Sequence, residues 1–374
     1  MKGINTMKVT RMMMGMAAVV AGLLFSSLAH AGDAPITPSV VPGRWSADKA
    51  WQWYNQQPWP CGFNYVPANA VSYTEMWMDY NFNPELIDKE LAVAEGVGFN
   101  CLRVILPFVV WEKEPEAFKK RLSAFLDICH KRRIKVMLGL FDDCAFGPIK
   151  DPVFGKQPDM VLGWYSNAWT PSPGHSMVRD ASTWPRLEKY VTDLLTTFGK
   201  DQRVWVWDLY NEPGNGGLGK VTVPLVAKVF EWARQVNPVQ PLTVGLWCST
   251  GYAVAEMNSD IITFHNYKVP DQLRRDIMGK KNSKRPMICT EWMHRKDGST
   301  VEGCLPVLRE NKVGSMNWGL VNGKTQTHLN WGHRPGQPDP KVWQHDLFRP
   351  DYTPYDPKEI ELFKAAIREN SEQR

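Results

Sequence analysis

The sequence predicts a (β/α)8 barrel, the α/β fold in which eight parallel strands close on themselves and a helix follows each strand. Eight short runs rich in apolar and β-branched residues alternate with longer segments whose apolar residues recur at helical spacing. The strand candidates are apolar on both faces. A parallel barrel requires this, because its interior covers one face of each strand and helices cover the other.

The predicted elements follow one another in a regular order. The strand candidates are 61–66, 99–106, 134–141, 204–210, 241–247, 260–267, 286–292 and 313–320. The clearest helical segments are 84–97, 115–132, 185–198, 221–236, 301–310 and 357–369. In the first of these, Asn83 and Pro84 are start signals, and Ile87, Leu91 and Ala94 share one face. Patterns after the fifth and sixth strands are weaker, and we expect short helices there.

Two connections are unusually long. Residues 142–183 follow the third strand and residues 321–356 follow the eighth, at the end where barrel enzymes build active sites. Both are rich in Trp, Pro, Gly and Asn, and the aromatic content argues against disorder. An open, doubly wound sheet is the alternative fold, but no GxGxxG follows the first strand and no Walker loop is present. A single-domain barrel with two long functional loops is therefore expected.

The first 31 residues have the pattern of a secretory signal peptide. Lys2, Lys8 and Arg11 precede an apolar run that ends in Ala29-His30-Ala31, with small residues at the −3 and −1 positions. A membrane anchor is the alternative, but the run is shorter than the roughly 20 residues that span a bilayer. We expect cleavage after Ala31, a catalytic domain over 32–374, and a periplasmic or secreted protein without membrane attachment.

Charge and cysteine content exclude several kinds of partner. Loss of the leader would remove three basic residues and no acidic ones, so the formal net charge would fall from +5 to +2. Without a basic run, neither nucleic acid nor an anionic membrane is an expected partner. None of the seven cysteines has the spacing of a zinc site, and they leave room for one disulfide but no disulfide framework.

The 17 tryptophans point toward a sugar ligand. Five lie in or beside loop-like segments: Trp164, Trp169, Trp318, Trp331 and Trp343. A large flat ring on a loop needs a stacking partner, and the apolar face of a sugar is a suitable one. Some of these rings, Trp164 and Trp169 included, could instead pack against their own loop.

Two glutamates terminate apolar strand candidates. Glu212 follows the fourth, in "VWVWDLYNEP", and Glu291 ends the seventh, in "MICTEW". Strands four and seven of an eight-stranded barrel lie nearly opposite each other, so we expect the two carboxylates to face each other across the mouth. Two opposed carboxylates are the minimum machinery for cleaving a glycosidic bond.

These motifs resemble the retaining glycoside hydrolases of clan A, and especially glycoside hydrolase family 5, the cellulase family. The resemblance covers essentially all of 32–374. It implies that Glu212 is the acid/base and Glu291 the nucleophile, and that Asn211 binds the 2-hydroxyl of the sugar. It also implies no metal or organic cofactor.

Further residues of the family's site match on other strands. The resemblance implies that Arg103, in "CLRV", keeps the nucleophile ionised. His265 and Tyr267, in "FHNY", match the family's His-x-Tyr pair, whose tyrosine hydroxyl touches the nucleophile. Trp318, in "MNWG", resembles the tryptophan beneath the −1 sugar.

Two features depart from the family pattern. Many members carry histidine after the third strand, where this chain has Asp142 and Asp143. Carboxylates there would recognise sugar hydroxyls differently, although both could instead cap the loop. The loop "WGLVNGKTQTHLNWG" resembles a family branch labelled cellulase-like or xylanase-like, and its Lys324, Gln326 and His328 could simply be solvated.

The neighbours of the two glutamates predict opposite pKa shifts. Arg103 and a tyrosine hydroxyl would lower the pKa of Glu291. An apolar setting near Trp205 and Trp207 would raise the pKa of Glu212. This division of roles predicts retention of anomeric configuration.

The sequence thus favours an exported, monomeric enzyme that hydrolyses β-linked carbohydrates by double displacement. The long loops would narrow the cleft, which favours exo-action. Three alternatives remain: a transglycosylase, an endo-acting glucanase, mannanase or xylanase, and a catalytically dead barrel that binds sugar. The presence of both glutamates, Arg103 and Tyr267 argues against the last, since binding alone does not require that set.

Overall fold

Eight parallel strands form a closed barrel in which each strand pairs with its sequence neighbours and β8 pairs with β1. The computed structural model describes residues 40–247 and 252–372, so the predicted leader lies outside the described residues. The strands are β1 Cys61–Asn64, β2 Cys101–Ile105, β3 Lys135–Gly139, β4 Val204–Asn211, β5 Leu242–Leu246, β6 Ile262–His265, β7 Met287–Glu291 and β8 Gly314–Trp318. The predicted fold and all eight predicted strands are confirmed.

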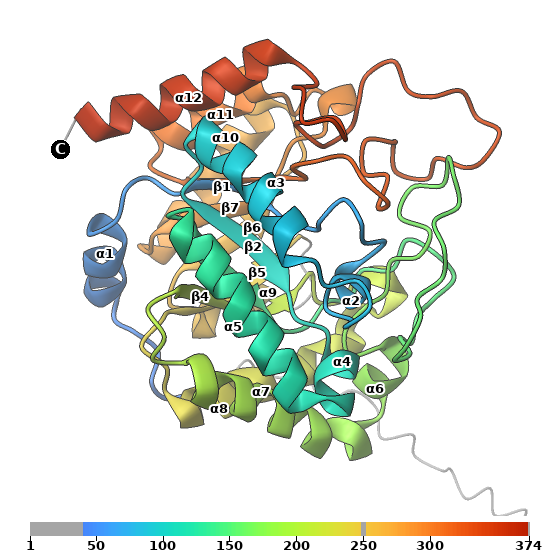
Figure 1. Cartoon of the computed structure of the whole chain (residues 1–374). Coiled ribbons are helices and arrows are strands. Elements are labelled where there is room, and N and C mark those ends of the chain that lie inside the picture. The colour runs from blue at the N-terminus through green and yellow to red at the C-terminus, as the bar shows by residue number, and fades with distance from the viewer. Residues whose placement is uncertain (1–39, 248–251, 373–374) are drawn as a thin grey trace, which may run out of the picture. The chain divides into compact units, whose positions relative to one another are not determined.

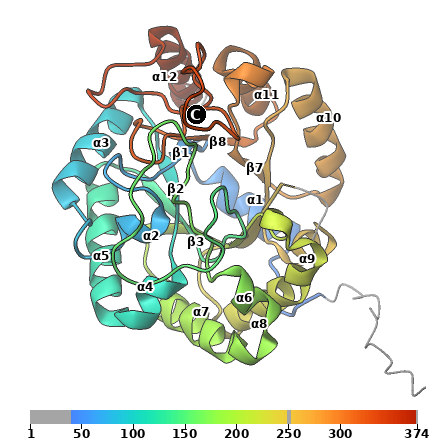
Figure 2. The same cartoon turned by 90° about the vertical axis from the view of Figure 1, so that its right-hand side faces the viewer.

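A ring of helices surrounds the barrel (Figure 2). Its members are α3 Pro84–Val97, α5 Pro115–Lys131, α7 Trp184–Phe198, α8 Val223–Val236, α9 Tyr252–Asn258, α10 Pro270–Lys280, α11 Val301–Glu310 and α12 Pro357–Glu372. The predicted helices are confirmed, and α9 and α10 are the short helices expected after the fifth and sixth strands. In α3 the Asn83 side chain accepts from the amide of Leu86, and Gly98 ends the helix at φ 99°.

Several short elements have too little periodicity to be predicted. The short α-helices are α1 Ala47–Asn55, α2 Tyr73–Met76, α4 Phe108–Lys113 and α6 His175–Arg179. The 3-10 turns are η1 Ala181–Thr183, η2 Asn215–Gly217, η3 Gly219–Thr222, η4 Lys281–Ser283 and η5 Arg295–Asp297. No helix among the described residues is long and apolar enough to cross a membrane.

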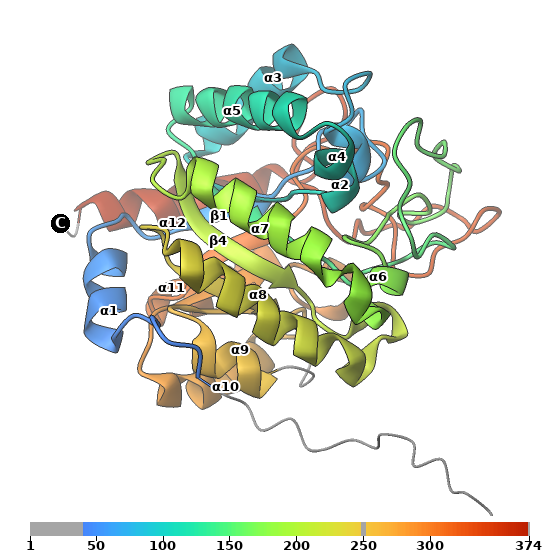
Figure 3. The same ribbon diagram turned by 90° about the horizontal axis from the view of Figure 1, so that it is seen from below.

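Helix α1 packs at the amino end of the barrel, opposite the long loops (Figures 1 and 3). The Trp53 ring stacks on Trp205 with centroids 5.6 Å apart, and both belong to an apolar cluster separate from the main core. Buried Asp260 ties this end together: it accepts from the amides of Trp45 (2.7 Å) and Leu242 (2.8 Å) and pairs with Arg234 (2.7 Å). Trp205 therefore lies at the end of the barrel away from Glu212.

The two long loops lie side by side at the opposite end (Figures 1 and 2). Gln326 joins them most extensively, because its side chain donates to the carbonyls of Val161 (2.8 Å) and Trp164 (3.1 Å) and accepts from the amide of Gly163 (2.8 Å). The interpretation of Gln326 as a solvated residue is wrong, since it is buried. These bonds fix one loop against the other, over the mouth of the barrel.

Asp260→Ala should lower the free energy of unfolding by about 3–5 kcal/mol, because it removes the carboxylate partner of the Arg234 guanidinium and the acceptor of two buried amides. Denaturant unfolding would measure the loss. The matched control is Asp127→Ala, which removes an exposed partner of Arg203 and should cost less than about 1 kcal/mol. Equal losses in the two variants would contradict the role assigned to Asp260.

Candidate active site

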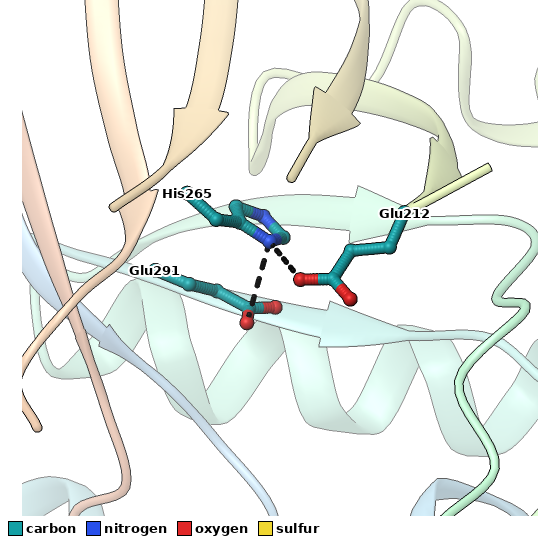
Figure 4. A group of neighbouring side chains, drawn as sticks. All are labelled: Glu212, His265 and Glu291. Carbon is teal, nitrogen blue, oxygen red and sulfur yellow. Dashed lines mark hydrogen bonds and ion pairs between the residues drawn. The ribbon is translucent and has the colours of Figure 1, made fainter. Parts of the chain in front are cut away.

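The two glutamates lie at the carboxyl ends of β4 and β7 and approach each other (Figure 4). Glu291 is the last residue of β7, and Glu212 directly follows β4. One oxygen of each carboxylate and a ring nitrogen of His265 lie within 4.8 Å of one another. Both carboxylates are buried. The predicted meeting of Glu212 and Glu291 across the mouth is what the structure shows.

Glu212 adopts a backbone conformation that is rare for a residue with a side chain. Its φ is 45°, in the left-handed region, while its amide donates to the carbonyl of Gly245 on β5 (2.8 Å). Such backbone strain, of order 1–3 kcal/mol, persists only where surrounding contacts fix it, and it often marks a functional position. Here it turns the chain sharply where the strand ends.

Arg103 organises the floor of the site. Its guanidinium is completely buried, donating to Glu291 Oε1 (2.8 Å) and to Asp208 Oδ2 (2.6 and 2.8 Å). It also donates to Asn64 Oδ1 (3.0 Å) and Asn211 Oδ1 (2.5 Å). Burial alone would lower the pKa of Arg103, but Asp208 and Glu291 raise it above its ordinary value. Arg103 thus stays charged beside the predicted nucleophile.

Two members of this network, Asp208 and Asn64, were not predicted from the sequence. Both are polar residues inside strands that otherwise appear apolar, and that interruption was the available signal. The Asp208 carboxylate also accepts from the amide of Gly245 through Oδ1 (3.0 Å).

The predicted lowering of the Glu291 pKa is wrong in its net direction. Burial raises the pKa of Glu291, and the nearby charge of Glu212 adds to the rise. His265, Arg103 and the Tyr267 hydroxyl, which donates to Oε2 (2.6 Å), oppose the rise without cancelling it. The contacts with Arg103 and Tyr267 are those predicted, but the prediction left out the cost of desolvating the carboxylate.

Burial also raises the pKa of Glu212, in the predicted direction. The surroundings differ from the prediction, because Trp205 lies at the far end of the barrel and Trp207 donates to Gln240 in the core (3.2 Å). The partners of Oε2 are the Cys144 thiol (3.1 Å) and the Asn215 amide. Glu212 is therefore surrounded mainly by neutral groups.

His265 lies between the two glutamates (Figure 4). Its Nδ1 is 2.5 Å from Glu212 Oε1 and 3.4 Å from Glu291 Oε2. Burial lowers the pKa of His265 to about 4, so the ring is neutral near pH 7. His265 thus contacts both glutamates, and it does not line the cavity above them.

Asp142 and Asp143 do not line the cavity either, so the structure does not support the predicted contact with sugar hydroxyls. Asp142 accepts from Asn211 (2.8 Å) and from the Trp169 indole (3.1 Å), and burial raises its pKa to about 6. Asp143 accepts from Tyr210 (2.6 Å), Thr222 (2.7 Å) and the amide of Gly214 (2.7 Å). Burial raises the pKa of Asp143 to about 7. Both brace the loops that carry other site residues.

A cavity of about 170 Å³ opens above the glutamates. Its lining combines polar side chains with aromatic rings: Tyr73, Ile105, Cys144, Phe146, Tyr165, Trp169, Asn211, Glu212, Asn215, Trp247, Tyr267, Glu291, Trp318 and Trp331. Trp169 and Trp318, both predicted site residues, contact each other edge to face with centroids 5.7 Å apart. The structure therefore brings the predicted residues Asn211, Tyr267, Trp169 and Trp318 to one cavity with both glutamates.

Among the described residues, Glu212, His265 and Glu291 form the one group of three potential ligands whose atoms lie close enough together to hold a metal ion. Two ligands about 2.1 Å from a tetrahedral ion are roughly 3.4 Å apart. His265 Nδ1 and Glu212 Oε1 are 2.5 Å apart, which is a hydrogen-bond distance. The arrangement fits a shared proton better than a shared metal ion. The six cysteines within the described residues are all buried and unpaired with one another.

Tyr267→Phe should raise the pKa of Glu291 by about one unit, because it removes a hydrogen bond to the charged form of the carboxylate. We would measure the pKa by NMR titration of carboxyl-labelled glutamate in a Glu212→Gln background, with Glu291→Gln to assign the signal. Tyr54→Phe is the control, since that hydroxyl donates to a carbonyl at the other end of the barrel. A pKa that does not move, or that falls, would refute the assigned contact.

Comparison with solved structures shows the same fold in glycoside-cleaving enzymes. Exo-β-1,4-mannosidase Op5Man5 from Opitutaceae bacterium strain TAV5 aligns with a TM-score of 0.60 at 17% identity, covering 84% of this chain and 60% of that one. This chain therefore spans less than two thirds of that protein's length. A GH5_18 structure from Streptomyces cattleya in complex with GlcNAc aligns at 0.59 and 12% identity, covering 85% and 82%.

The endo-β-1,4-mannanase of Thermotoga petrophila aligns at 0.55 and 15% identity, covering 85% of this chain and 78% of that one. No curated protein sequence matches this chain significantly. At the level of sequence families, the model described as Cellulase (glycosyl hydrolase family 5) matches residues 69–324, which is more than half of the chain. The protein is therefore a member of glycosyl hydrolase family 5.

Proposed function

We propose that the protein is an exported exo-acting β-glycosidase, in which Glu291 is the nucleophile and Glu212 the acid/base. The observation that carries this proposal is the pair of buried carboxylates, with oxygens within 4.8 Å, at the floor of a small aromatic cavity. Retaining enzymes hold their carboxyl groups about 5–5.5 Å apart, whereas inverting enzymes leave about 6.5–9.5 Å for a water molecule.

The contacts of each carboxylate support its proposed role. Glu291 faces the Arg103 cation and the Tyr267 hydroxyl, both of which favour the ionised form that attacks the anomeric carbon. Glu212 contacts mostly neutral groups, which favours the protonated form needed to assist the leaving oxygen. After the leaving group departs, ionised Glu212 takes a proton from the water that attacks the glycosyl-enzyme, and Glu291 is released.

Exo-action is supported by the joined loops and the small cavity. Hydrogen bonds of Gln326 join the two loops, and Tyr165 and Trp331, one from each loop, line the cavity and contact each other (3.2 Å). The volume of about 170 Å³ is below the roughly 300–1,000 Å³ of pockets that hold drug-sized ligands. A short β-linked oligosaccharide, cleaved at its end, suits this space better than the middle of a long chain.

A terminal β-mannoside is the first substrate to test, because two of the enzymes with the same fold are named for β-1,4-mannosidic linkages. Asp142 and Asp143 do not indicate which sugar is bound, because their carboxylates accept hydrogen bonds from protein groups and do not line the cavity. Transglycosylation is the second candidate. It is favoured by Trp247, which lines the cavity and is 52% exposed, so that its ring is available to bind an acceptor sugar.

The test is hydrolysis of methyl and aryl β-mannosides, β-glucosides and β-xylosides by the wild type and by Glu212→Ala and Glu291→Ala, the methyl glycosides being the unactivated substrates. We expect both variants to lose at least about a thousandfold in kcat/KM, about 4 kcal/mol of transition-state stabilisation, on unactivated substrates. Proton NMR of the first product should show retained configuration.

Azide separates the two roles. In Glu212→Ala, azide should attack the glycosyl-enzyme and give a β-glycosyl azide, whereas in Glu291→Ala it should replace the nucleophile and give the α-anomer. If Glu212→Ala gave the α-glycosyl azide and Glu291→Ala the β-anomer, Glu212 would be the nucleophile and Glu291 the acid/base. Wild type that binds a sugar but cleaves no substrate would favour the non-catalytic barrel, and products larger than the substrate would favour transglycosylation.

Gln326→Ala should allow cleavage farther from the end of the substrate, because it removes three hydrogen bonds between the loops. We expect longer products from a β-linked hexasaccharide, with little change in kcat/KM for an aryl monosaccharide. Chromatography of products over time measures both. Gln337→Ala is the control, because it removes the hydrogen bond that the Arg334 amide donates to Gln337 Oε1 within one loop. An unchanged product pattern in Gln326→Ala would remove the main support for exo-action by loop closure.

A further inference from the structure

A thiol lies against the proposed acid/base. Cys144 Sγ is 3.1 Å from Glu212 Oε2, and the side chain is buried at 4% exposure while still lining the cavity. Its amide donates to Asp142 Oδ1 (2.9 Å), so the loop after β3 places it firmly. Neither the motifs of the sequence nor the proposed chemistry assigns this residue a role.

The neighbours of the sulfur determine which way its proton points. Asn211 Nδ2 (3.5 Å) and Asn215 Nδ2 (3.4 Å) both donate toward Sγ. A thiol has one proton and can also accept weakly. With two amide donors aimed at the sulfur, the S–H is directed toward the carboxylate of Glu212, the acceptor beside it. Burial raises the pKa of the Cys144 thiol, with Asp142 and Glu212 adding to the rise, so it remains an S–H donor.

We propose that Cys144 is a positioning residue that holds Oε2 of Glu212 while His265 holds Oε1, so that the carboxyl group is fixed from both sides. This inference rests on the proposed role of Glu212 as acid/base. The bond from Nδ1 of His265 is on the opposite oxygen, and Asn215 shares Oε2 with the thiol. Rotation of the carboxyl group would break contacts on both oxygens.

A weak donor at this position suits a group that must change its protonation state twice per cycle. A thiol donor favours the ionised form of Glu212, the form that accepts the proton of water in the second step. Because S–H is a weak donor, it opposes protonation in the first step only slightly. Cys144 thus lowers the pKa of Glu212 against the larger effect of burial.

The first readout is the pH dependence of kcat/KM for an unactivated β-glycoside. Activity falls at alkaline pH as Glu212 loses its proton. Cys144→Ala removes a donor to the ionised form, so the Glu212 pKa should rise and the alkaline limb should move up by roughly half a pH unit. Cys144→Ser, which keeps a donor, should return the limb to within about 0.2 units of wild type. The control Cys304→Ala removes a thiol on α11 and should leave the limb unchanged.

The second readout is the dependence on the leaving group. A dinitrophenyl glycoside needs little protonation of its leaving oxygen, so Cys144→Ala should lose at least threefold more kcat/KM on the unactivated substrate than on the activated one. A merely structural defect would lower both equally. An unmoved alkaline limb with equal losses would overturn the inference, and so would a Cys144→Ser limb displaced by half a unit, even if Cys144→Ala fails to fold.

Glu212→Ala tested on the same two substrates separates this inference from the proposed function. If Glu212→Ala loses activity equally on both substrates, Glu212 is not the acid and both proposals fall. If its loss is concentrated on the unactivated substrate while Cys144→Ala behaves like wild type, the acid/base assignment stands and the positioning role of Cys144 is rejected.

Discussion

The buried guanidinium of Arg103 is the constraint on which the site depends. A buried cation that is neither neutralised nor hydrogen-bonded lowers the stability of the fold by several kcal/mol. Three strands besides that of Arg103 supply that environment: Asn64 comes from β1, Asp208 and Asn211 from β4, and Glu291 from β7. The strands must therefore close in one register for the charge to be satisfied. Even β5 takes part, because a Cβ on Gly245 would lie 3.1 Å from the guanidinium.

The same arrangement explains how two buried glutamates can differ. Burial raises the pKa of both, so desolvation does not distinguish them. Their hydrogen-bond partners do, since Glu291 accepts from a cation and a phenol while Glu212 accepts from a thiol, an amide and the neutral ring of His265. A single proton shared by the pair would therefore reside on Glu212. The proposed division of roles follows from the contacts with Arg103 on β2 and with Tyr267 just after β6 more than from apolarity around either carboxylate.

The barrel was predictable because strands that are apolar on both faces form a strong local pattern, and the two glutamates were predictable because each ends such a strand. The errors lay in long-range contacts. Asp208 is a single charged residue within apolar β4. Its importance appears only once Arg103 of another strand lies beside it. Trp207 neighbours Asp208 in sequence, but successive side chains of a strand point to opposite faces, so Trp207 packs in the core away from the site. Asp142 and Asp143 also took their roles from distant partners.

The residues proposed to carry out the chemistry and those proposed to limit the substrate lie in different parts of the chain. The family match covers residues 69–324 and thus includes both glutamates, Arg103, Tyr267 and Trp318, all borne by strand ends. It stops where the last loop begins, and that loop supplies Trp331 to the cavity and Gln326 to the hydrogen bonds that join the two loops. Loops held by hydrogen bonds before substrate arrives need not be ordered on binding, which lowers its entropic cost. In the proposed function, residues at the strand ends thus cleave the glycosidic bond, and the joined loops limit how much of a carbohydrate can reach it.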